Sequence, residues 1–231
     1  MQTVWKVNGN SKLLLFFSGW AMDENPTAHL NHEGFDLCTC FDYTNLETSA
    51  IEQWRNYSEI VLVAWSTGVW AAEQVLGKLN LPISQAIAIN GTPTTVHDET
   101  GIPRAIFQGT YDNLTAQSMQ KFLRRMFGSA TAYNAFVSSI PQRTLENQKT
   151  ELASILSVGF ETLVTGLIKW DKAIIGTEDA IFPPQNQMRY WFSRRDAVHC
   201  VSTLQIIKLP IPHFPFLNCT DFFLNQNSIK D

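Results

Sequence analysis

The chain has 231 residues, of which 45% are hydrophobic and 16% are charged, and its formal net charge is −4. This balance supplies enough apolar side chains for a buried core and excludes an intrinsically disordered chain. The acidic net charge argues against a general nucleic-acid-binding protein. The length predicts a single domain over residues 1–231.

Membrane segments and cofactor motifs are not apparent. No apolar run reaches the roughly 18 residues that cross a bilayer, and residues 1–10 lack the basic start and apolar stretch of a secretion signal. We therefore expect a cytoplasmic protein with no membrane partner. Cys38, Cys40, Cys200 and Cys219 form no CxxC pair, which predicts reduced thiols and no metal site. No glycine-rich phosphate-binding motif occurs, so no nucleotide or flavin cofactor is expected.

Strand patterns and helix patterns alternate along the chain. Asn8, Gly9 and Asn10 separate apolar runs at residues 4–7 and 13–17 and predict a β-hairpin. The alternation that follows predicts the α/β class, with a mostly parallel central sheet flanked by helices. Further strands are predicted at residues 35–41, 60–64, 86–89, 172–175 and 204–208.

The run at residues 60–64 is continuously apolar, which is typical of a central strand covered on both faces. Apolar residues recur at helical spacing directly after it, from Val69 to Leu79, and a second helix is predicted at residues 184–192. Residues 110–169 carry helical patterns, broken by Pro141, without a strand. This stretch predicts a helical cap insertion, over approximately residues 110–170, that covers one end of the sheet.

The clearest functional signal is the sequence AWSTG at residues 64–68, between the central strand and its helix. A serine at such a junction projects from a sharp turn at the carboxyl edge of the sheet. The turn requires small residues two positions before and after the serine, and Ala64 and Gly68 meet this requirement. We interpret Ser66 as a nucleophile; the alternative is a buried serine that caps a helix.

A nucleophilic serine requires a base, and the base requires an acid that orients it. In this architecture the chain order is serine, acid, histidine. Asp179 lies in a loop after the strand at residues 172–175 and is favoured as the acid over its neighbour Glu178. His213 lies after the last predicted strand, in a loop stiffened by three prolines at residues 209–216, and is the predicted base.

The other four histidines are less well placed. His199 precedes the last predicted strand, and His29, His32 and His97 precede the acid. We expect them to lie away from the nucleophile.

An oxyanion hole would complete the site with two backbone N–H groups. The N–H of Thr67, directly after the serine, is one predicted donor. The other is the N–H of Trp20, in the loop after the strand at residues 13–17, where Gly19 is expected to permit a tight turn. The indole of Trp20 would also line the acyl pocket; the alternative is that Trp20 only anchors the core.

Three segments resemble the BioG-type pimeloyl-[acyl-carrier protein] methyl ester esterases of the α/β-hydrolase superfamily. They are residues 13–23 (LLLFFSGWAMD), 63–72 (VAWSTGVWAA) and 89–92 (INGT). The resemblance covers most of the chain and is weakest across the helical insertion. Ala64 stands where hydrolases usually have glycine, but the position requires only a small side chain.

This resemblance implies a serine esterase that removes the methyl ester of pimeloyl-acyl carrier protein in biotin synthesis, through Ser66, His213 and an acyl-enzyme. A carrier protein is acidic, so its docking surface is expected to be basic. Residues 110–170 hold six basic and four acidic side chains, a net charge of +2. Arg124 and Arg125, with Trp20, are the candidates for carrier or substrate binding, although an ordinary solvated helix face has the same pattern.

Two other functions are compatible with the same sequence. A general carboxylesterase or thioesterase for small substrates would use the same three residues without a carrier protein. A hydrolase-fold binding protein would keep the cleft and lack the chemistry.

Overall fold

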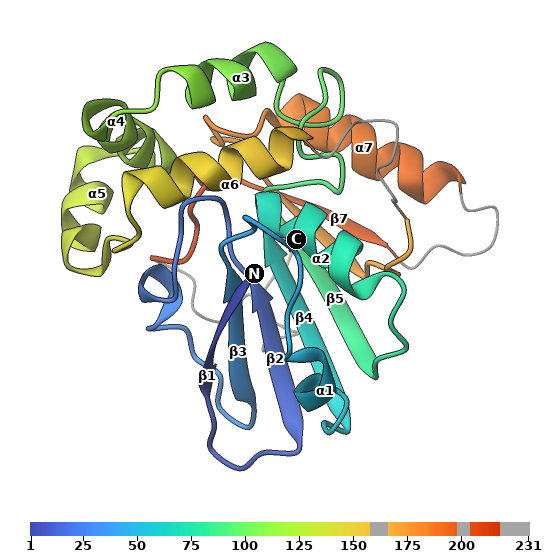
Figure 1. Ribbon diagram of the computed structural model, residues 1–231. Helices are drawn as coiled ribbons and strands as arrows, with labels where there is room; N and C mark the ends of the chain where they lie inside the picture. The colour runs from blue at the N-terminus through green and yellow to red at the C-terminus, as the bar shows by residue number, and fades with distance from the viewer. Residues whose placement is uncertain (158–165, 198–203, 218–231) are drawn as a thin grey trace.

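The computed structural model describes residues 1–157, 166–197 and 204–217. Within these ranges, seven strands form one sheet in the order β1-β3-β2-β4-β5-β6-β7 (Figure 1). Every neighbouring pair is parallel except β1 and β3. The strands are β1 (Gln2–Lys6), β2 (Lys12–Phe17), β3 (Asp36–Phe41), β4 (Glu59–Trp65), β5 (Ile83–Ile89), β6 (Lys172–Gly176) and β7 (Gln205–Leu209). The predicted strands are thus confirmed, with no end shifted by more than three residues.

The predicted hairpin between the first two strands is wrong. β3 lies between β1 and β2, antiparallel to β1 and parallel to β2. The carboxylate of Asp36, the first residue of β3, accepts the backbone N–H groups of Asn8 and Asn10 at 2.8 and 3.0 Å. The Asn-Gly-Asn turn therefore contacts β3, and both edges of β2 are occupied by parallel neighbours.

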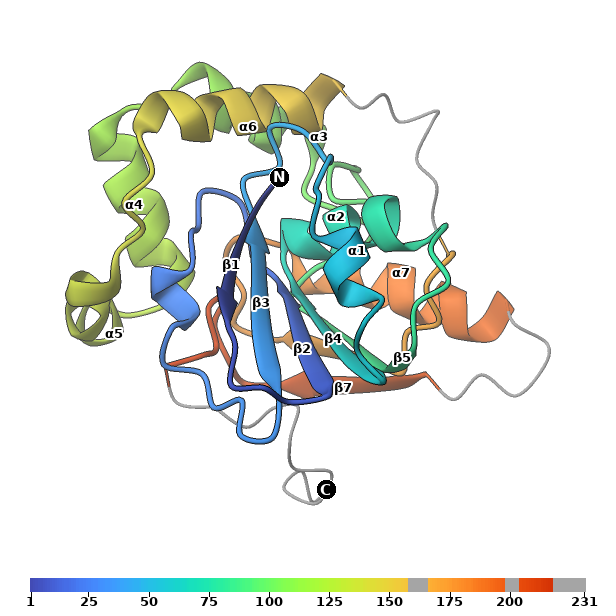
Figure 2. The ribbon, with the colours of Figure 1, turned by 60° about the horizontal axis from the view of Figure 1, so that its bottom comes forward.

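The core is centred on β2 and β4. Residues 13–17 of β2 are fully buried, and residues 60–65 of β4 are at most 6% exposed. This burial confirms that β4 is covered on both faces, as its continuous apolar run predicts. Helices α1 (Ile51–Trp54), α2 (Thr67–Leu76) and α7 (Pro184–Ala197) flank the sheet (Figure 2).

Four helices between β5 and β6 form a group that we call the cap helices. They are α3 (Arg104–Asp112), α4 (Ala116–Phe127), α5 (Ala130–Phe136) and α6 (Leu145–Ser157). Short 3₁₀ turns occur at η1 (Asn25–Thr27) and η2 (Val137–Ser139). Figure 1 shows the cap helices over the edge where the parallel strands end. They begin at Arg104, earlier than residue 110: Pro103 is the N-cap, and its carbonyl oxygen accepts the N–H of Phe107 at 3.0 Å.

Local sequence sets the limits of α4. Thr115 and Ser118 form a capping box at its start, and Gly128 ends it with φ 72°. Met119, Leu123 and Met126 are buried on one side. The opposite side carries the exposed cations Lys121, Arg124 and Arg125.

In the described ranges, no helix has the length and apolar character needed to cross a membrane. The same residues hold no group of three or more His, Cys, Asp and Glu side chains that could bind a metal ion. Cys38 and Cys40 are buried free thiols with their Sγ atoms 4.0 Å apart. Cys200 and Cys219 lie outside the described residues.

Candidate active site

Ser66 occupies a strained turn between β4 and α2. Its φ of 57° and ψ of −127° lie outside the regions that a residue with a side chain prefers. Two backbone hydrogen bonds fix the turn: Ser66 N–H donates to Ile89 O at 2.9 Å, and Val69 N–H donates to Ser66 O at 3.1 Å. A Cβ atom at Gly68 would lie 2.3 Å from the carbonyl oxygen of Phe17. The small residue that the sequence predicts at position 68 is therefore a spatial requirement.

The structure brings Ser66, His213 and Asp179 into one hydrogen-bonded series. Ser66 Oγ lies 2.9 Å from His213 Nε2, and His213 Nδ1 lies 2.8 Å from Asp179 Oδ2. The three side chains come from the turn after β4, the loop after β7 and the loop after β6. All are buried, with residue exposures of 4, 2 and 6%. Such an arrangement can remove the serine proton and stabilise the imidazolium that results.

Asp179 is held as an acceptor by more than the histidine. Its Oδ1 accepts the N–H groups of Ile181 and Phe182, both at 2.8 Å, and its Oδ2 accepts Gln187 Nε2 at 3.1 Å. Glu178, the alternative acid, is exposed to solvent. Sequence reasoning missed Gln187, which is fully buried on α7 and had no motif around it.

Asn90 joins the loops that carry the acid and the histidine. Its Nδ2 donates to the carbonyl oxygens of Pro212 and His213 at 2.9 Å, and its Oδ1 accepts the N–H of Gly176 at 2.6 Å. Trp65 Nε1 also donates to His213 O, at 2.8 Å. Sequence reasoning placed Asn90 just after a strand, in the segment INGT, and assigned it no role, because its partners lie far along the chain.

The two predicted oxyanion donors both border the cavity at Ser66. Within the described part of the chain, neither the N–H of Trp20 nor that of Thr67 is hydrogen bonded to another protein group. The tight turn is made differently from the expectation. Ala21 adopts the positive φ, 67°, and Met22 N–H donates to Gly19 O at 3.3 Å. Gly19 is needed for space instead, since a Cβ there would lie 3.0 Å from the Trp65 ring.

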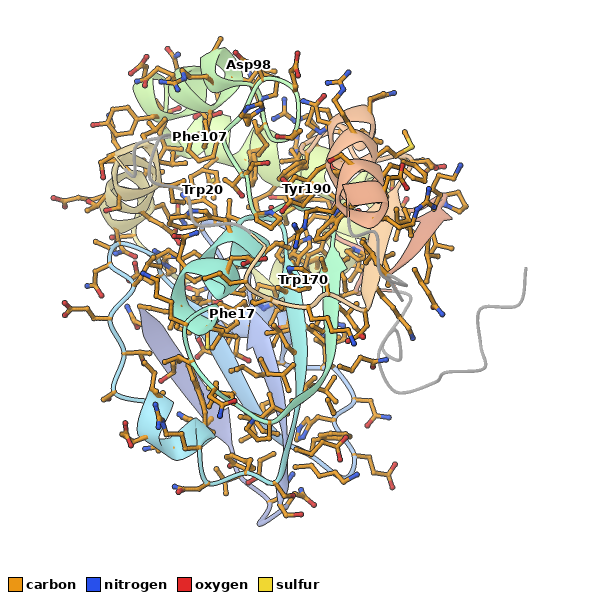
Figure 3. All side chains as sticks on the ribbon, turned by 90° about the vertical axis from the view of Figure 1, so that its right-hand side faces the viewer. Phe17, Trp20, Asp98, Phe107, Trp170 and Tyr190 are labelled. Atoms are coloured by element: carbon orange, nitrogen blue, oxygen red, sulfur yellow. The ribbon has the colours of Figure 1, made fainter. Side chains whose placement is uncertain are left out.

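The Trp20 side chain is both anchored and cavity-lining. Its Nε1 donates to the carbonyl oxygen of Gln148 on α6 at 2.9 Å, and its ring meets that of Phe122 edge-on at 5.0 Å. Figure 3 shows Trp20 and Phe107 between the cap helices and the sheet, with Phe17 lower in the sheet.

The cavity beside Ser66 is mainly apolar and small, about 30 Å³. A second hollow of about 320 Å³ lies at α3 and α4 and includes Lys121. Five residues line both spaces: Trp20, Ile106, Thr110, Phe122 and Arg125. The inner cavity and the outer hollow are thus adjacent, and we call the five side chains that border both of them the wall.

The two predicted docking arginines have different surroundings. Arg125 borders both spaces, whereas the guanidinium of Arg124 lies over the Tyr133 ring, 5.5 Å from its centroid. Both side chains are exposed, and α4 and α5 contain no acidic residue.

The remaining histidines form other contacts. His29 Nε2 is 2.8 Å from Phe216 O, and His32 Nδ1 is 3.0 Å from Phe35 O. His97 Nδ1 accepts the N–H groups of the loop residues Glu99 and Thr100. His199 lies outside the described residues.

Comparison with known proteins places this geometry in a family. A family model described as pimeloyl-ACP methyl esterase BioG matches residues 1–218. The crystal structure of BioG from Haemophilus influenzae has a TM-score of 0.84 and 33% identity, with 95% of this chain and 97% of that chain covered. An esterase from Exiguobacterium antarcticum, at 14% identity, has a TM-score of 0.69 over 94% of this chain and 90% of that one. The fold is therefore the predicted α/β-hydrolase fold.

Two sequence relatives differ in what they are called. A malonyl-[acyl-carrier protein] O-methyltransferase from Bacteroides fragilis is 49% identical over 178 residues, which are 77% of this chain and 36% of that protein. The chain thus spans about a third of that relative's length. An uncharacterized protein from Haemophilus influenzae is 37% identical over 183 residues, covering 79% of this chain and 83% of that protein. On the extent of the family match and the similarity to a solved member, the chain belongs to the BioG family of pimeloyl-ACP methyl esterases.

Proposed function

We propose that this protein hydrolyses the methyl ester of pimeloyl-acyl carrier protein, as a cytoplasmic step of biotin synthesis, with Ser66 as the nucleophile. The observation that carries the proposal is the hydrogen-bonded series from Ser66 through His213 to Asp179, beside a mainly apolar cavity, in a chain of the BioG family. The cavity walls suit a methylene chain, and the series suits an ester carbonyl.

In the first step, Ser66 Oγ attacks the carbonyl carbon of the methyl ester while His213 Nε2 takes the hydroxyl proton. Asp179 accepts a hydrogen bond from His213 Nδ1–H and stabilises the imidazolium without taking its proton. The N–H groups of Trp20 and Thr67 would donate to the carbonyl oxygen as it becomes negative. His213 then returns its proton to the methoxy oxygen, and methanol leaves.

In the second step, a water molecule attacks the acyl-enzyme that Ser66 carries. His213 takes a proton from the water, and the tetrahedral intermediate collapses with return of a proton to Ser66 Oγ. The products are the free terminal carboxylate, still joined to its carrier, and the restored serine.

The Bacteroides relative is consistent with such a substrate. Its name describes transfer of a methyl group to an acid on acyl carrier protein. Such a reaction makes a methyl ester of the kind that the proposed reaction removes. This chain covers 36% of that protein, so its similarity supports the substrate class without assigning methyl transfer to this chain.

The α4 surface suits an acidic carrier protein. Lys121, Arg124 and Arg125 are exposed there, beside the outer hollow. This hollow is adjacent to the cavity at Ser66 and shares five side chains with it. We propose that the carrier docks on this surface and that the chain linking it to the ester passes through the outer hollow. Opposite charges of this kind chiefly accelerate encounter and select the partner.

The reaction is tested by intact-mass analysis of the methyl ester of pimeloyl-acyl carrier protein after incubation with the protein. We expect the mass to fall by one methylene with the wild type and to stay unchanged with Ser66→Ala. Loss of the whole acyl arm would indicate a thioesterase. Hydrolysis of small esters with no change in the carrier-bound ester would indicate a general carboxylesterase. Labelling by a phosphonate without hydrolysis of any ester would contradict an esterase function.

Carrier docking is tested by charge reversal on α4. Arg124→Glu is the sharper variant because Arg125 also borders the cavity at Ser66. We expect a higher KM for the carrier-bound ester and an unchanged rate on a small ester. Arg55→Glu, at the end of α1 on an exposed surface away from the cap helices, makes the same change of charge as a control. Equal losses on both esters, or equal effects of the two variants, would contradict docking at α4.

A further inference from the structure

A buried ion pair lies outside the proposed catalytic residues. Glu151 on α6 is fully buried, and its Oε2 lies 2.8 Å from Arg143 Nη1, in the segment before that helix. Arg143 also pairs with Asp42, with 3.0 Å between Nη2 and Oδ1. Burial raises the pKa of Glu151, and the neighbouring Arg143 opposes this effect. Burying a charged side chain lowers the stability of the folded protein unless well-placed partners compensate for the lost hydration. The partners of Glu151 and Arg143 therefore indicate the role of the pair.

Both members of the pair contact the loop that carries Trp20. We call residues 19–22 the oxyanion loop. Glu151 Oε2 accepts the N–H of Ala21 at 3.1 Å, and Arg143 Nη1 donates to the carbonyl oxygen of Met22 at 3.0 Å. The other oxygen of Glu151 accepts the N–H of Tyr43 at 2.8 Å, at the end of β3. The pair thus joins the oxyanion loop to the cap segment and to the sheet.

The oxyanion loop needs such support. Met22 N–H closes a four-residue turn on Gly19 O, and Ala21 occupies its third position with φ 67°. A positive φ at this position is characteristic of a type II turn and is normally taken by glycine. Alanine favours the type I turn, which is reached by rotating the peptide between Trp20 and Ala21. In the observed turn, the N–H of that peptide points at the Glu151 carboxylate.

We propose that Glu151, supported by Arg143, is a positioning residue that holds the Trp20–Ala21 peptide of the oxyanion loop. Through it, the neighbouring Gly19–Trp20 peptide is held so that the Trp20 N–H faces the oxygen of an ester bound at Ser66. The inference rests on the proposed function, since it assigns a role within the same site. The consequence is that α6 and the residues just before it, which supply Glu151 and Arg143, contribute to the chemical step and not only to substrate binding.

The kinetic test is Glu151→Gln with a small ester as substrate. The amide loses the negative charge and turns one acceptor into a donor that faces Ala21 N–H, Tyr43 N–H or Arg143. Removal of an oxyanion donor typically lowers kcat by about 10²–10³-fold. Because Glu151→Gln misplaces the donor without removing it, we expect kcat to fall by up to about 10²-fold, with little change in KM. Arg143→Lys, which keeps the charge but loses the fork of two N–H contacts, should lower kcat in the same way but less.

Glu73→Gln is the matched control. Glu73 is also fully buried, and its carboxylate accepts the N–H groups of Leu167 and Ile168 and the indole Nε1 of Trp170, away from the oxyanion loop. We expect it to lower the melting temperature while kcat stays close to that of the wild type. A similar fall of kcat in Glu151→Gln and Glu73→Gln would overturn the proposal.

A second readout does not depend on activity. In hydrogen–deuterium exchange, the peptide containing Ala21 and Met22 should exchange faster in Glu151→Gln than in the wild type, and at the wild-type rate in Glu73→Gln. Unchanged exchange in Glu151→Gln would overturn the proposal.

The two proposals can fail separately. If the wild type hydrolyses only small esters, the proposed substrate fails and the kinetic test still applies. If it hydrolyses none, the esterase function fails, and exchange alone decides whether Glu151 holds the loop. Arg143→Lys supplies both readouts if Glu151→Gln does not fold.

Discussion

Adjacent residues in this chain have opposite environments, and the site depends on the difference. Asp179 is buried and accepts four hydrogen bonds, whereas Glu178 is exposed. The two backbone N–H donors to Asp179 come from residues 181 and 182, two and three positions after it. A loop that folds back on its own carboxylate in this way presents the second oxygen to His213 Nδ1 and turns the preceding side chain outward.

This difference predicts the outcome of two conservative substitutions. Asp179→Asn should lower kcat by about 10³–10⁴-fold, because the amide no longer holds His213 in the tautomer that accepts the Ser66 proton. Glu178→Gln, one residue away, should leave kcat within about twofold. Steady-state kinetics on a small ester measure both. If Glu178→Gln caused the larger loss, the role proposed for Asp179 would be wrong.

Sequence alone predicted the positions of Ser66, His213 and Asp179, because each follows a strand whose apolar pattern is strong and the order of the three is fixed in this fold. It could not predict Gln187, Asn90 or the pair Arg143 and Glu151. The hydrogen-bond partners of their side chains lie from 4 to 130 residues away in the chain, and polar side chains without a motif give no sign of burial. These residues are visible only when the loops are placed beside one another.

At the scale of elements, the ends of β5, β6 and β7 meet through one side chain. Asn90 follows β5 with φ 47°, and its amide joins Gly176 at the end of β6 to the loop after β7. This one amide makes three hydrogen bonds, two of them buried, and so helps to link the acid loop and the histidine loop.

Loss of this link should affect stability and activity together. Asn90→Ala removes three hydrogen bonds. It leaves the N–H of Gly176 and the carbonyl oxygen of Pro212 without these partners, at a cost of about 1–3 kcal/mol for each, whereas His213 O keeps the indole of Trp65. We expect kcat to fall as well, because His213 loses part of its support. Asn186→Ala is the control, since its Nδ2 donates to two carbonyl oxygens, those of Asp98 and Gly101, away from Ser66. It should lower the free energy of unfolding and leave kcat nearly unchanged. Chemical denaturation and kinetics on the same samples separate the two effects.

The first strands show the limit of local patterns. An Asn-Gly-Asn sequence predicts a turn correctly, but it does not identify the partner strand. The turn connects β1 to β2, but the two strands do not pair, because β3 lies between them in the sheet. Asp36 stabilises this arrangement: its carboxylate accepts N–H groups from the turn and the hydroxyl of Tyr57, the latter at 2.9 Å. A carboxylate 26 residues beyond the turn is not part of any hairpin signal.

The contact between Asp36 and Tyr57 predicts how stability depends on alkaline pH. Burial and the hydrogen bond to Asp36 raise the pKa of Tyr57 from 10.0 to about 12. Between these values the native state keeps a proton that the unfolded state has lost, so the free energy of unfolding should fall as the pH rises from 10 to about 12. Tyr57→Phe should remove this part of the dependence. Urea titrations across this range measure it; an equal slope in both proteins would contradict the raised pKa.

At the scale of the whole molecule, the candidate site lies between two structural layers. The loops after the strands supply Ser66, His213 and Asp179, and the cap helices supply most of the apolar side chains that line the cavity beside them. The inner cavity, at about 30 Å³, is far smaller than the roughly 300–1,000 Å³ of a typical ligand pocket. An acyl chain that reaches Ser66 therefore has to displace side chains of the wall shared with the outer hollow.

Phe122 is the wall residue whose removal tests this arrangement. Its ring packs edge-on against Trp20 and borders both spaces, so Phe122→Ala should join the inner cavity to the outer hollow. We expect kcat/KM for p-nitrophenyl esters of long acyl chains to rise several-fold relative to the acetate, because longer chains no longer displace a ring. Phe35→Ala removes another half-buried ring, at the start of β3 and the opposite end of the sheet, and should leave the ratio unchanged. If the ratio were the same in wild type and Phe122→Ala, the wall would not limit entry, and acyl chains would reach Ser66 by another path between the sheet and the cap helices.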